Sequence, residues 1–376
     1  MIKGYLRTAK VPFISGLIME YYSISCGIEG ILRKGVQREM KRTRLNYVDL
    51  AKGVAMLLVM LGHCKHTPKL LEAWLYTFHM PLFFALSGYT LNLDRFCTFK
   101  EFARNRFRRL IIPYFWLAFS LAILRIVFRE SLAFSVKHLK WLISIPIGWR
   151  LNGWYFTMWF IPTLFFAELL FYILFRKKQN SKKSFVFAMM GSFLMGIIAS
   201  KKVKGFIWSL DLVPFALVFL ILGYMLHSLV ENDRGHRCGL EAVIFLWIVN
   251  LVTGFWNYKC YSMVDLYYCK TGHPILFLVS ACSGVLGTIL VCKMIEKNKL
   301  IEYIGRNSLV YYAFQNSLVI PIVTNWIKLL GKQISVFANT GIALIAVMAG
   351  SCMVLALMSE VIKKYFPFMI GLQKAK

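Results

Sequence analysis

About ten long apolar stretches, separated by short basic segments, leave this 376-residue chain few folds to choose from. A helix needs about 20 mainly apolar residues to cross the hydrocarbon core of a bilayer. The stretches that reach or approach this length are roughly 45–64, 71–93, 111–128, 155–175, 185–200, 207–229, 240–256, 273–294, 308–330 and 337–360. They predict an all-α, polytopic membrane protein with about ten transmembrane helices and no room for a soluble domain.

The charge distribution favours the same class. The chain is 58% apolar and 16% charged, and its formal net charge is +28. In a soluble protein this excess would suggest nucleic-acid binding, but here the basic residues cluster between apolar runs, as in cytoplasmic loops of membrane proteins. We therefore expect membrane lipids, and no nucleic acid, as partners.

The orientation follows from the side on which Lys and Arg collect. About two thirds of the 45 Lys and Arg residues fall on the side of residues 1–44, although a loop with Lys201, Lys202 and Lys204 opposes this trend. Positive residues stay preferentially in the cytoplasm. The sequence thus predicts two cytoplasmic termini, in the cytoplasmic (inner) membrane if the protein is bacterial.

The first 40 residues differ from the rest of the chain. Glu20 and Glu29 interrupt their apolar stretch, whereas a signal peptide has an unbroken apolar region before a small-residue cleavage site. Met40 is followed by Lys-Arg-Thr-Arg and then by the first strong span. We expect residues 1–39 to be an extension upstream of a true start at Met40, and residues 40–376 to form a single membrane-embedded domain.

The first span carries three ionisable residues, Asp49, Lys52 and His63, which are costly inside a bilayer. On an ideal helix, Lys52 and His63 lie about 20° apart in azimuth and about 16 Å apart along the axis, and Asp49 is about 40° to the other side of His63. The spacing predicts one polar face, with a cation near one end and an imidazole near the other. The alternative is that Lys52 snorkels and His63 ends the helix among headgroups.

The second span contains His79 at a depth comparable to that of His63, followed by Pro81, Ser87 and Tyr89. We expect Pro81 to free a backbone carbonyl and bend this helix. A lone intramembrane histidine is often a hydrogen-bonded structural residue, but two on consecutive helices favour a shared polar site.

A basic segment follows the second span and includes Arg108 and Arg109. Guanidinium groups at a membrane boundary suit either anionic headgroups or a phosphorylated ligand. The nine cysteines contain no close-set pair of the metal-ligand kind, and no metal motif is present. Cys260 and Cys269 are the two that could pair in an oxidising compartment.

Five segments carry a resemblance to a known family, the membrane acyltransferase 3 family, and in particular to its fucose 4-O-acetylase-like sugar O-acetyltransferases. The resemblance extends from about residue 44 to 362. It rests on the Lys52…His63 spacing, on Phe78-His-Met-Pro-Leu-Phe-Phe-Ala-Leu-Ser-Gly-Tyr89, on Arg108-Arg-Leu-Ile-Ile-Pro-Tyr114, on Trp159-Phe-Ile-Pro-Thr-Leu-Phe165 and on Ile304-Gly-Arg-Asn-Ser308-Leu-Val-Tyr-Tyr312.

This resemblance implies transfer of an acyl group, usually acetyl from cytoplasmic acetyl-CoA, to a hydroxyl of a carbohydrate, a cell-surface glycan or a glycolipid precursor. The family's basic residue and histidine fall on Lys52 and His63, and its arginine pair falls on Arg108 and Arg109. Many relatives have a histidine three residues after Tyr312, where this chain has Gln315. Glutamine cannot take a proton at neutral pH, so an acid–base role there is in doubt.

The chemistry needs a base for the acceptor hydroxyl, and imidazole titrates in the right range. We expect His63 to be this base, with His79, Ser87 or Tyr89 holding its ring or the developing oxyanion. Lys52 and the arginine pair would bind the phosphates of the acyl donor. Further candidates for a substrate-binding or supporting role are Asp49, Trp159, Glu168, Tyr312 and Gln315.

A carrier for a small solute or a lipid-linked sugar is the alternative function, because it would use the same polar face as a path. A transporter normally has two related halves, and this sequence shows none.

Overall fold

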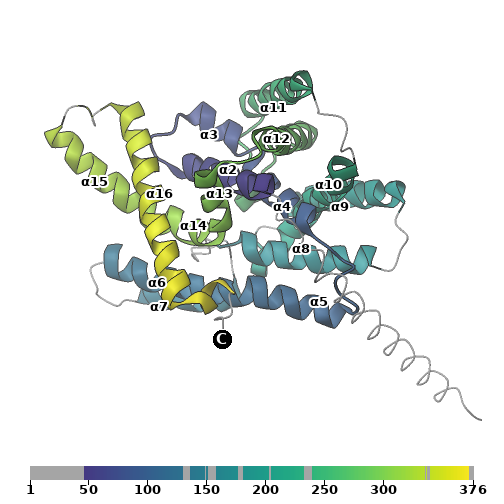
Figure 1. Cartoon of the computed structure of the whole chain (residues 1–376), viewed down its shortest axis with the longest axis horizontal. Helices are drawn as coiled ribbons and strands as arrows, with labels where there is room; N and C mark the ends of the chain where they lie inside the picture. The colour runs from purple at the N-terminus through teal and green to yellow at the C-terminus, as the bar shows by residue number, and fades with distance from the viewer. Residues whose placement is uncertain are drawn as a thin grey trace, which may run out of the picture. The chain divides into compact units, whose positions relative to one another are not determined.

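The computed structural model describes residues 46–129, 136–148, 150, 158–176, 181–202, 205–232, 239–334, 336 and 339–371. The regular structure in these ranges is helical, apart from an isolated β-bridge between Asp265 and Lys270. The predictions for residues 1–39 and for a start at Met40 lie outside the described residues. Asn46–Lys376 forms one compact unit, and the predicted all-α membrane fold is confirmed for the part described (Figure 1).

Six helices in the described ranges are long and apolar enough to cross a bilayer, and Phe160–Phe175 is a shorter apolar helix. The six are Phe99–Phe128, Lys182–Lys201, Ile207–Leu229, Leu240–Cys260, Pro274–Ile295 and Thr340–Tyr365. The helices are α2 (Asn46–His63), α3 (Lys69–Leu75), α4 (His79–Thr90), α5 (Phe99–Arg106), η1 (Phe107–Ile111), α6 (Ile112–Arg129), α7 (Val136–Ile147), α8 (Phe160–Phe175), α9 (Lys182–Lys202), η2 (Ile207–Leu212), α10 (Val213–Asn232), α11 (Leu240–Cys260), η3 (Leu266–Tyr268), α12 (Pro274–Ile295), α13 (Lys299–Arg306), α14 (Ser308–Phe314), η4 (Gln315–Val319), α15 (Ile320–Gln333), α16 (Thr340–Tyr365) and η6 (Pro367–Ile370).

The predicted second span is wrong as a single helix. It is divided into α3, which ends at Leu75, and α4, which begins at His79. Phe78 interrupts the helix with a φ of −137°. Pro81 therefore lies in the first turn of α4, where its missing N–H would have no helical partner in any case, and it does not bend a continuous helix.

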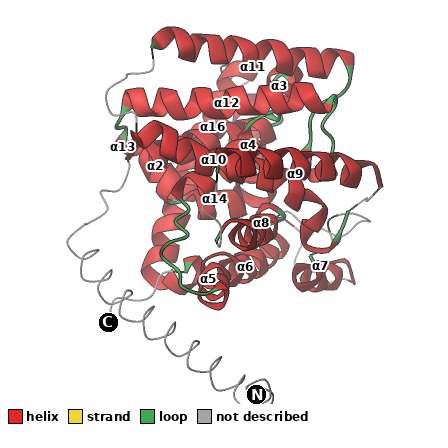
Figure 2. Ribbon diagram, turned by 90° about the vertical axis from the view of Figure 1, so that its right-hand side faces the viewer, coloured by secondary structure: helices red, strands yellow, loops and turns green. Residues whose placement is uncertain are grey.

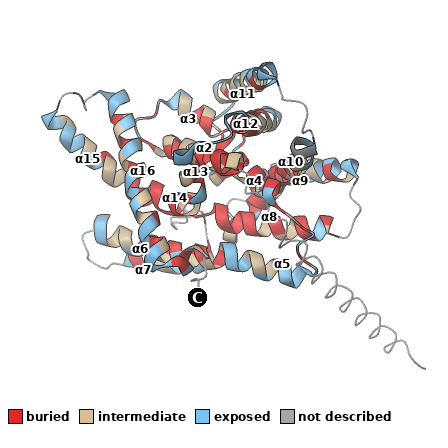
Figure 3. Cartoon of the chain, in the orientation of Figure 1, coloured by how far each residue is buried: buried red, intermediate tan, exposed pale blue. Residues whose placement is uncertain are grey.

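Buried residues concentrate in α2, α4, α8, α10 and α14, whereas α11, α15 and α16 expose much of their surface (Figure 3). The exposed apolar surface on these outer helices suits a lipid environment. Figure 2 shows α11 and α12 lying side by side, with α10 and α9 beyond α12. The polar residues of α2 and α4 thus lie inside the helical unit.

The contact between α4 and α10 depends on two glycines. A Cβ added at Gly88 would overlap the carbonyl oxygen of Leu220, and one at Gly223 would overlap that of Ala85. No side chain fits at either position, because the opposing atoms belong to backbone. This close approach fixes the position of α4, which carries His79.

We expect Gly223→Ala to lower the amount of folded protein in membranes severalfold, because α10 would have to move away from α4. Gly191→Ala in α9 is the matched control, since a Cβ there meets nothing within 4 Å and alanine favours helix. Quantitative blotting of detergent-soluble monodisperse protein measures both variants. Equal amounts of folded protein for the two variants would show that α4 and α10 can separate at little cost.

Candidate functional site

Two histidines and a tyrosine meet at the break between α3 and α4. The Tyr76 hydroxyl lies 3.3 Å from Nδ1 of His63, at the end of α2. The Tyr76 ring packs edge-on against the rings of His63 and His79, with centroid distances of 6.2 and 4.9 Å. The structure therefore brings together the two histidines that the sequence singles out, with Tyr76 between them.

The break in the helix determines the tautomer of His79. Its Nδ1 lies 2.6 Å from the backbone carbonyl oxygen of Leu75. A carbonyl can only accept a hydrogen bond, so Nδ1 carries the proton and Nε2 of the neutral ring carries the lone pair. His79 is 4% exposed, which keeps this arrangement away from bulk solvent.

His63 is more accessible than His79, because its side chain is only partly buried. The contact with Tyr76 can form in either direction, since a hydroxyl both donates and accepts. When Nδ1–H of His63 donates to the tyrosine oxygen, Nε2 is left with the lone pair that a base requires. Sequence reasoning missed Tyr76, and its only signal was its place three residues before His79.

Ser87 and Tyr89 lie at the opposite end of α4, and the expectation that they hold an imidazole ring or an oxyanion beside it is wrong. Ser87 is eight residues from His79, or about 12 Å along an α-helix. Its hydroxyl donates to Glu168 at 2.7 Å, while the hydroxyls of Tyr89 and Tyr47 lie 2.7 Å apart. These contacts stabilise the packing of α4 on α8 and α2.

Glu168, another candidate for a substrate-binding or supporting role, is already paired inside the protein. It is 2% exposed, it accepts the Ser87 hydrogen bond, and its Oε2 lies 3.2 Å from Nε of Arg106. Nine residues of chain separate it from Trp159, which precedes the first turn of α8. Arg106 thus neutralises a buried carboxylate instead of facing solvent.

Arg108 and Arg109 differ from Arg106 because both are exposed. They lie in η1, a short π-helical turn inside the long helix Phe99–Phe128, and such turns occur frequently at functional sites. Neither forms an ion pair with a carboxylate among the residues described, although Glu168 lies within electrostatic range of Arg109. Arg109 also lies within electrostatic range of Arg95 and Arg106, so this cluster fits a phosphate-bearing ligand.

Lys52 lies near the same end as this arginine cluster. It follows Tyr47 by five residues on α2, and Tyr47 contacts Tyr89 at the end of α4 near Ser87. Because α2 is one continuous helix, Lys52 and His63 are separated by about 16 Å along its axis. The structure therefore separates a basic end from a histidine end.

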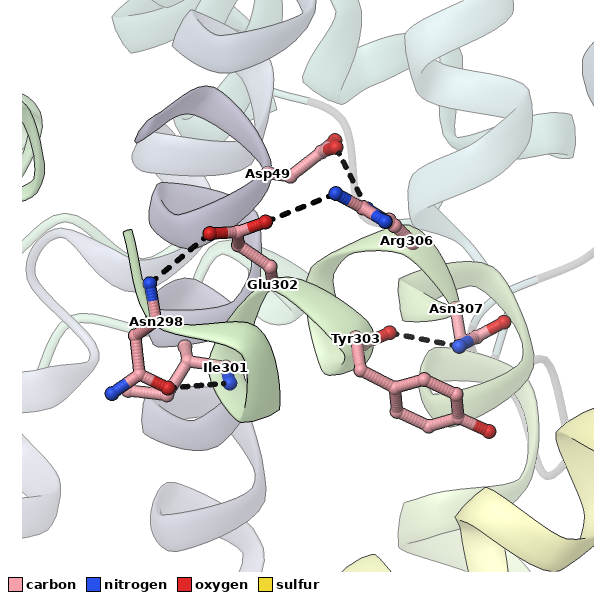
Figure 4. A network of polar contacts seen from close by, with 7 residues as sticks. All are labelled: Asp49, Asn298, Ile301, Glu302, Tyr303, Arg306 and Asn307. Carbon is pink, nitrogen blue, oxygen red and sulfur yellow. Dashed lines mark hydrogen bonds and ion pairs between the residues drawn. The ribbon is translucent and has the colours of Figure 1, made fainter. Parts of the chain in front are cut away.

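Asp49 belongs to an ion-pair network that joins α2 to α13 (Figure 4). Nε of Arg306 lies 3.3 Å from Asp49, and its Nη2 donates to Glu302 at 3.0 Å. Glu302 also accepts a hydrogen bond from the backbone of Asn298 at 3.0 Å. Within the expected substrate-binding or supporting role, this network gives Asp49 a structural contact between two helices, and Arg306 was missed although it lies in the Ile304–Tyr312 segment.

We expect Asp49→Ala to lower the stability of the purified protein by about 1 kcal/mol, a charged hydrogen bond discounted for the partial exposure of Arg306. Arg306→Ala also removes the partner of Glu302, so the Asp49→Ala/Arg306→Ala double variant should be less stable than Asp49→Ala, but its loss should be smaller than the sum of the two single losses, because both singles remove the same Asp49–Arg306 contact. Thermal unfolding in detergent measures both. If the double variant lost as much stability as the two single variants together, or more, the result would contradict this pairing.

Tyr312 and Trp159 lie at the start of α8, and Gln315 follows Tyr312 by three residues. The Tyr312 hydroxyl accepts a hydrogen bond from the backbone N–H of Phe160 at 3.1 Å, which satisfies a free donor of the helix N-terminus. Gln315 begins the second π-helical turn, η4, and is 2% exposed. Its Oε1 has no hydrogen-bond partner within the described part of the chain.

The described residues contain neither a group of side chains suited to a metal ion nor a disulfide between Cys260 and Cys269. No group of three or more His, Cys, Asp or Glu side chains there could hold a metal ion. Cys260 and Cys269 are both free thiols. Burial raises the pKa of the Cys269 thiol to about 12, which keeps it protonated at neutral pH.

Comparisons with known proteins give two matches. The model of a family described as an acyltransferase domain matches residues 45–357. Over 109 residues the chain is 30% identical to the O-antigen ligase of Escherichia coli (strain K12), and this stretch is 28% of the chain and 23% of the ligase. The chain thus spans less than a quarter of the length of that curated relative. No solved structure matches the chain.

Proposed function

Given that the chain belongs to the family defined by this acyltransferase domain and is a membrane acyltransferase, we propose that it is an O-acetyltransferase. It moves an acetyl group from cytoplasmic acetyl-CoA to a hydroxyl of a carbohydrate, either a cell-surface glycan or its precursor. The observation that carries this proposal is the cluster of His63, Tyr76 and His79 at the break before α4.

In the proposed reaction, His63 removes the proton of the acceptor hydroxyl through Nε2. The hydroxyl oxygen attacks the thioester carbonyl carbon, the new C–O ester bond forms, and the C–S bond breaks. The proton on His63 then passes to the departing thiolate, which restores the neutral imidazole. Tyr76 positions the His63 ring, and general-base catalysis of this kind contributes about 10²–10⁴-fold.

His79 keeps the surroundings of Tyr76 fixed. Its Nδ1–H bond to Leu75 prevents the ring from rotating, and the edge-on contact with Tyr76 holds the phenol against His63. His63 and His79 also lie within electrostatic range of one another. Two positive charges at this distance would repel, so a neutral His79 does not oppose the charge that His63 carries after it takes the proton.

The donor is assigned to the basic end. Arg108 and Arg109 offer exposed guanidinium groups to the phosphates of the nucleotide, and Lys52 lies near the same end. About 16 Å along α2 then separates the phosphates from the base, which an extended pantetheine arm can cover. The nucleotide stays on one side while the thioester reaches the histidines.

Two observations support a saccharide as the acceptor: the name of the matched relative and the position of Trp159. The matched relative is named as an O-antigen ligase, which favours a surface polysaccharide as the acceptor of this chain too. Trp159, 8% exposed at the start of α8, adds an aromatic face of the kind that packs on sugar rings.

The proposal is tested with membranes that contain the full chain, incubated with acetyl-CoA labelled in the acetyl group. We expect alkali-labile label in extracted glycan, because esters are cleaved by base, and no such label with membranes containing His63→Ala. Membranes that transport or bind sugar yet transfer no label would contradict acetyl transfer and favour the carrier function.

A further inference from the structure

A buried arginine and aspartate lie outside the motifs that carry the family resemblance. Arg150 follows α7 and is 1% exposed, and Asp211, in η2, is 6% exposed. Nη2 of the arginine lies 2.5 Å from Oδ2 of the aspartate. A charged pair this deep is costly to bury and is retained only with good geometry or a use.

The backbone around this pair is held by hydrogen bonds from separate segments. Trp208 donates its backbone N–H to Gly148 at 2.9 Å and its indole N–H to Pro146 at 3.0 Å. The Tyr267 hydroxyl donates to the carbonyl oxygen of Arg150 at 2.6 Å. The end of α7, η2 and η3 are thus joined around the pair.

Two residues of η2 have an unusual backbone. Trp208 and Ser209 have φ values of 56° and 55°, in the left-handed region that residues other than glycine rarely adopt. Such conformations cost free energy and persist where the surroundings impose them, often at ligand-binding sites. The strained stretch ends two residues before Asp211.

The pair has unused hydrogen-bonding capacity. Nε and Nη1 of Arg150 and Oδ1 of Asp211 have no hydrogen-bond partner among the residues that the structure describes, and neither has Oγ of Ser209, which is fully buried. Buried polar atoms are almost always paired in native proteins. Donors and an acceptor left open side by side therefore point to a ligand.

The character of the open atoms selects the ligand. The pair is neutral overall, and it offers N–H donors beside a carboxylate oxygen that can only accept. A phosphate or carboxylate would face the charge of Asp211, whereas a sugar hydroxyl both donates and accepts. The Tyr267 ring lies 5.7 Å from the Arg150 guanidinium carbon and 6.4 Å from the Trp159 ring, which supplies aromatic surface.

The pair also lies on the side of the histidine cluster. Tyr76, between the two histidines, is within electrostatic range of Asp265. Asp265 is in turn within range of Arg150 and directly precedes η3, which contains Tyr267. Trp159, whose ring lies 6.4 Å from that of Tyr267, precedes α8, whereas Glu168, the partner of Arg106, lies nine residues further along that helix.

We propose that Arg150 and Asp211 form the acceptor subsite, which binds an uncharged, hydroxyl-rich edge of a sugar ring. The assignment rests on the proposed acetyl transfer and adds where and by which atoms the acceptor is recognised. Arg150 donates to sugar oxygens through Nε and Nη1, and Asp211 accepts a sugar hydroxyl proton through Oδ1. Tyr267 and Trp159 border the ring.

The test uses the double variant Arg150→Met/Asp211→Leu, because removing one partner alone would leave a buried unpaired charge and threaten folding. The probe is surface glycan extracted from cells lacking the gene, with labelled acetyl-CoA as donor. We expect the KM for glycan to rise about tenfold or more, since several hydrogen bonds are lost. The KM for acetyl-CoA, and CoA release to water without glycan, should stay within about twofold of wild type.

The matched control is Glu360→Leu/Lys363→Met, which replaces an exposed ion pair in α16 with the same residue types. An unchanged KM for glycan in Arg150→Met/Asp211→Leu would overturn the subsite. A fall in CoA release without glycan as large as the rise in that KM would overturn it too. Carboxyl reduction of the glycan should leave the wild-type KM unchanged, and a rise would overturn the uncharged assignment. Wild-type membranes that transfer no label would instead contradict the proposed function itself.

Discussion

Replacing His63 by alanine is expected to reduce acetyl transfer by about a hundredfold or more, because the acceptor hydroxyl loses its base. The loss should fall on kcat, since the imidazole acts on a proton that moves only as the reaction proceeds. His63 is only partly buried at the end of α2, so the variant should insert and accumulate normally. Initial rates with labelled acetyl-CoA, normalised to protein in the membrane, measure the effect.

His227→Ala is the matched control for this variant. His227 packs edge-on against Tyr89 at 5.1 Å, at the end of α4 remote from His79. Its loss should leave kcat within about threefold of wild type, because His227 is placed away from the proposed reaction. More than about a tenth of wild-type turnover in His63→Ala would show that another group is the base.

The second large effect is expected at the basic end. Replacing both Arg108 and Arg109 by alanine should raise the KM for acetyl-CoA roughly fiftyfold, because each lost guanidinium–phosphate contact is a charge-assisted hydrogen bond. Phosphate contacts act in the ground state as well as in the transition state, so kcat should change little. Lys52→Ala should have a smaller effect, since an ammonium lacks the bidentate geometry of arginine.

Arg104→Ala separates donor binding from lipid binding. Arg104 is exposed on the preceding α5, where it would meet headgroups but not the donor proposed for η1. The KM of this variant for acetyl-CoA should stay near that of wild type. In the wild type, the contacts of Arg108 and Arg109 with the donor phosphates should weaken as the salt concentration rises. An unchanged KM in the double variant and in Lys52→Ala would place the donor elsewhere.

Much of the fold follows from the sequence because apolar length and charge clustering act locally. A run of 20 apolar residues dictates a helix wherever it lies in a bilayer, and every predicted span contains helix in the residues described. The common face of Lys52 and His63 also follows, since it needs only a continuous helix over Asn46–His63. Local rules give no account of where a helix breaks under tertiary contacts.

The break before His79 is such a case. Tyr76 and Phe78 are as apolar as their neighbours, and nothing in their composition ends a helix, so the carbonyl of Leu75 was not expected to fix a histidine. The partners of Asp49 and Glu168 come from α13 and from α5, far along the chain. Pairings between distant segments have no local pattern, and for this reason Ser87 and Tyr89 were assigned to the histidine end.

Arg150 and Asp211 escaped sequence reasoning for a related reason. Arg150 lies between two predicted spans, Asp211 lies near the start of the predicted span 207–229, and 61 residues separate them. Only the turn at Gly148 and the left-handed residues of η2 bring them together. A sequence pattern does not mark Arg150, which becomes buried between spans, and a single carboxylate near the end of a span resembles a residue at the membrane boundary.

The most direct measurement is the ester content of surface glycans from cells that lack the gene, complemented either with wild-type protein or with His63→Ala at equal abundance. Alkali-released acetate, measured per unit of glycan, should be lost on deletion, restored by the wild type and not restored by His63→Ala. The same acetate content in all these cells, or restoration by His63→Ala, would contradict acetyl transfer by the histidine cluster.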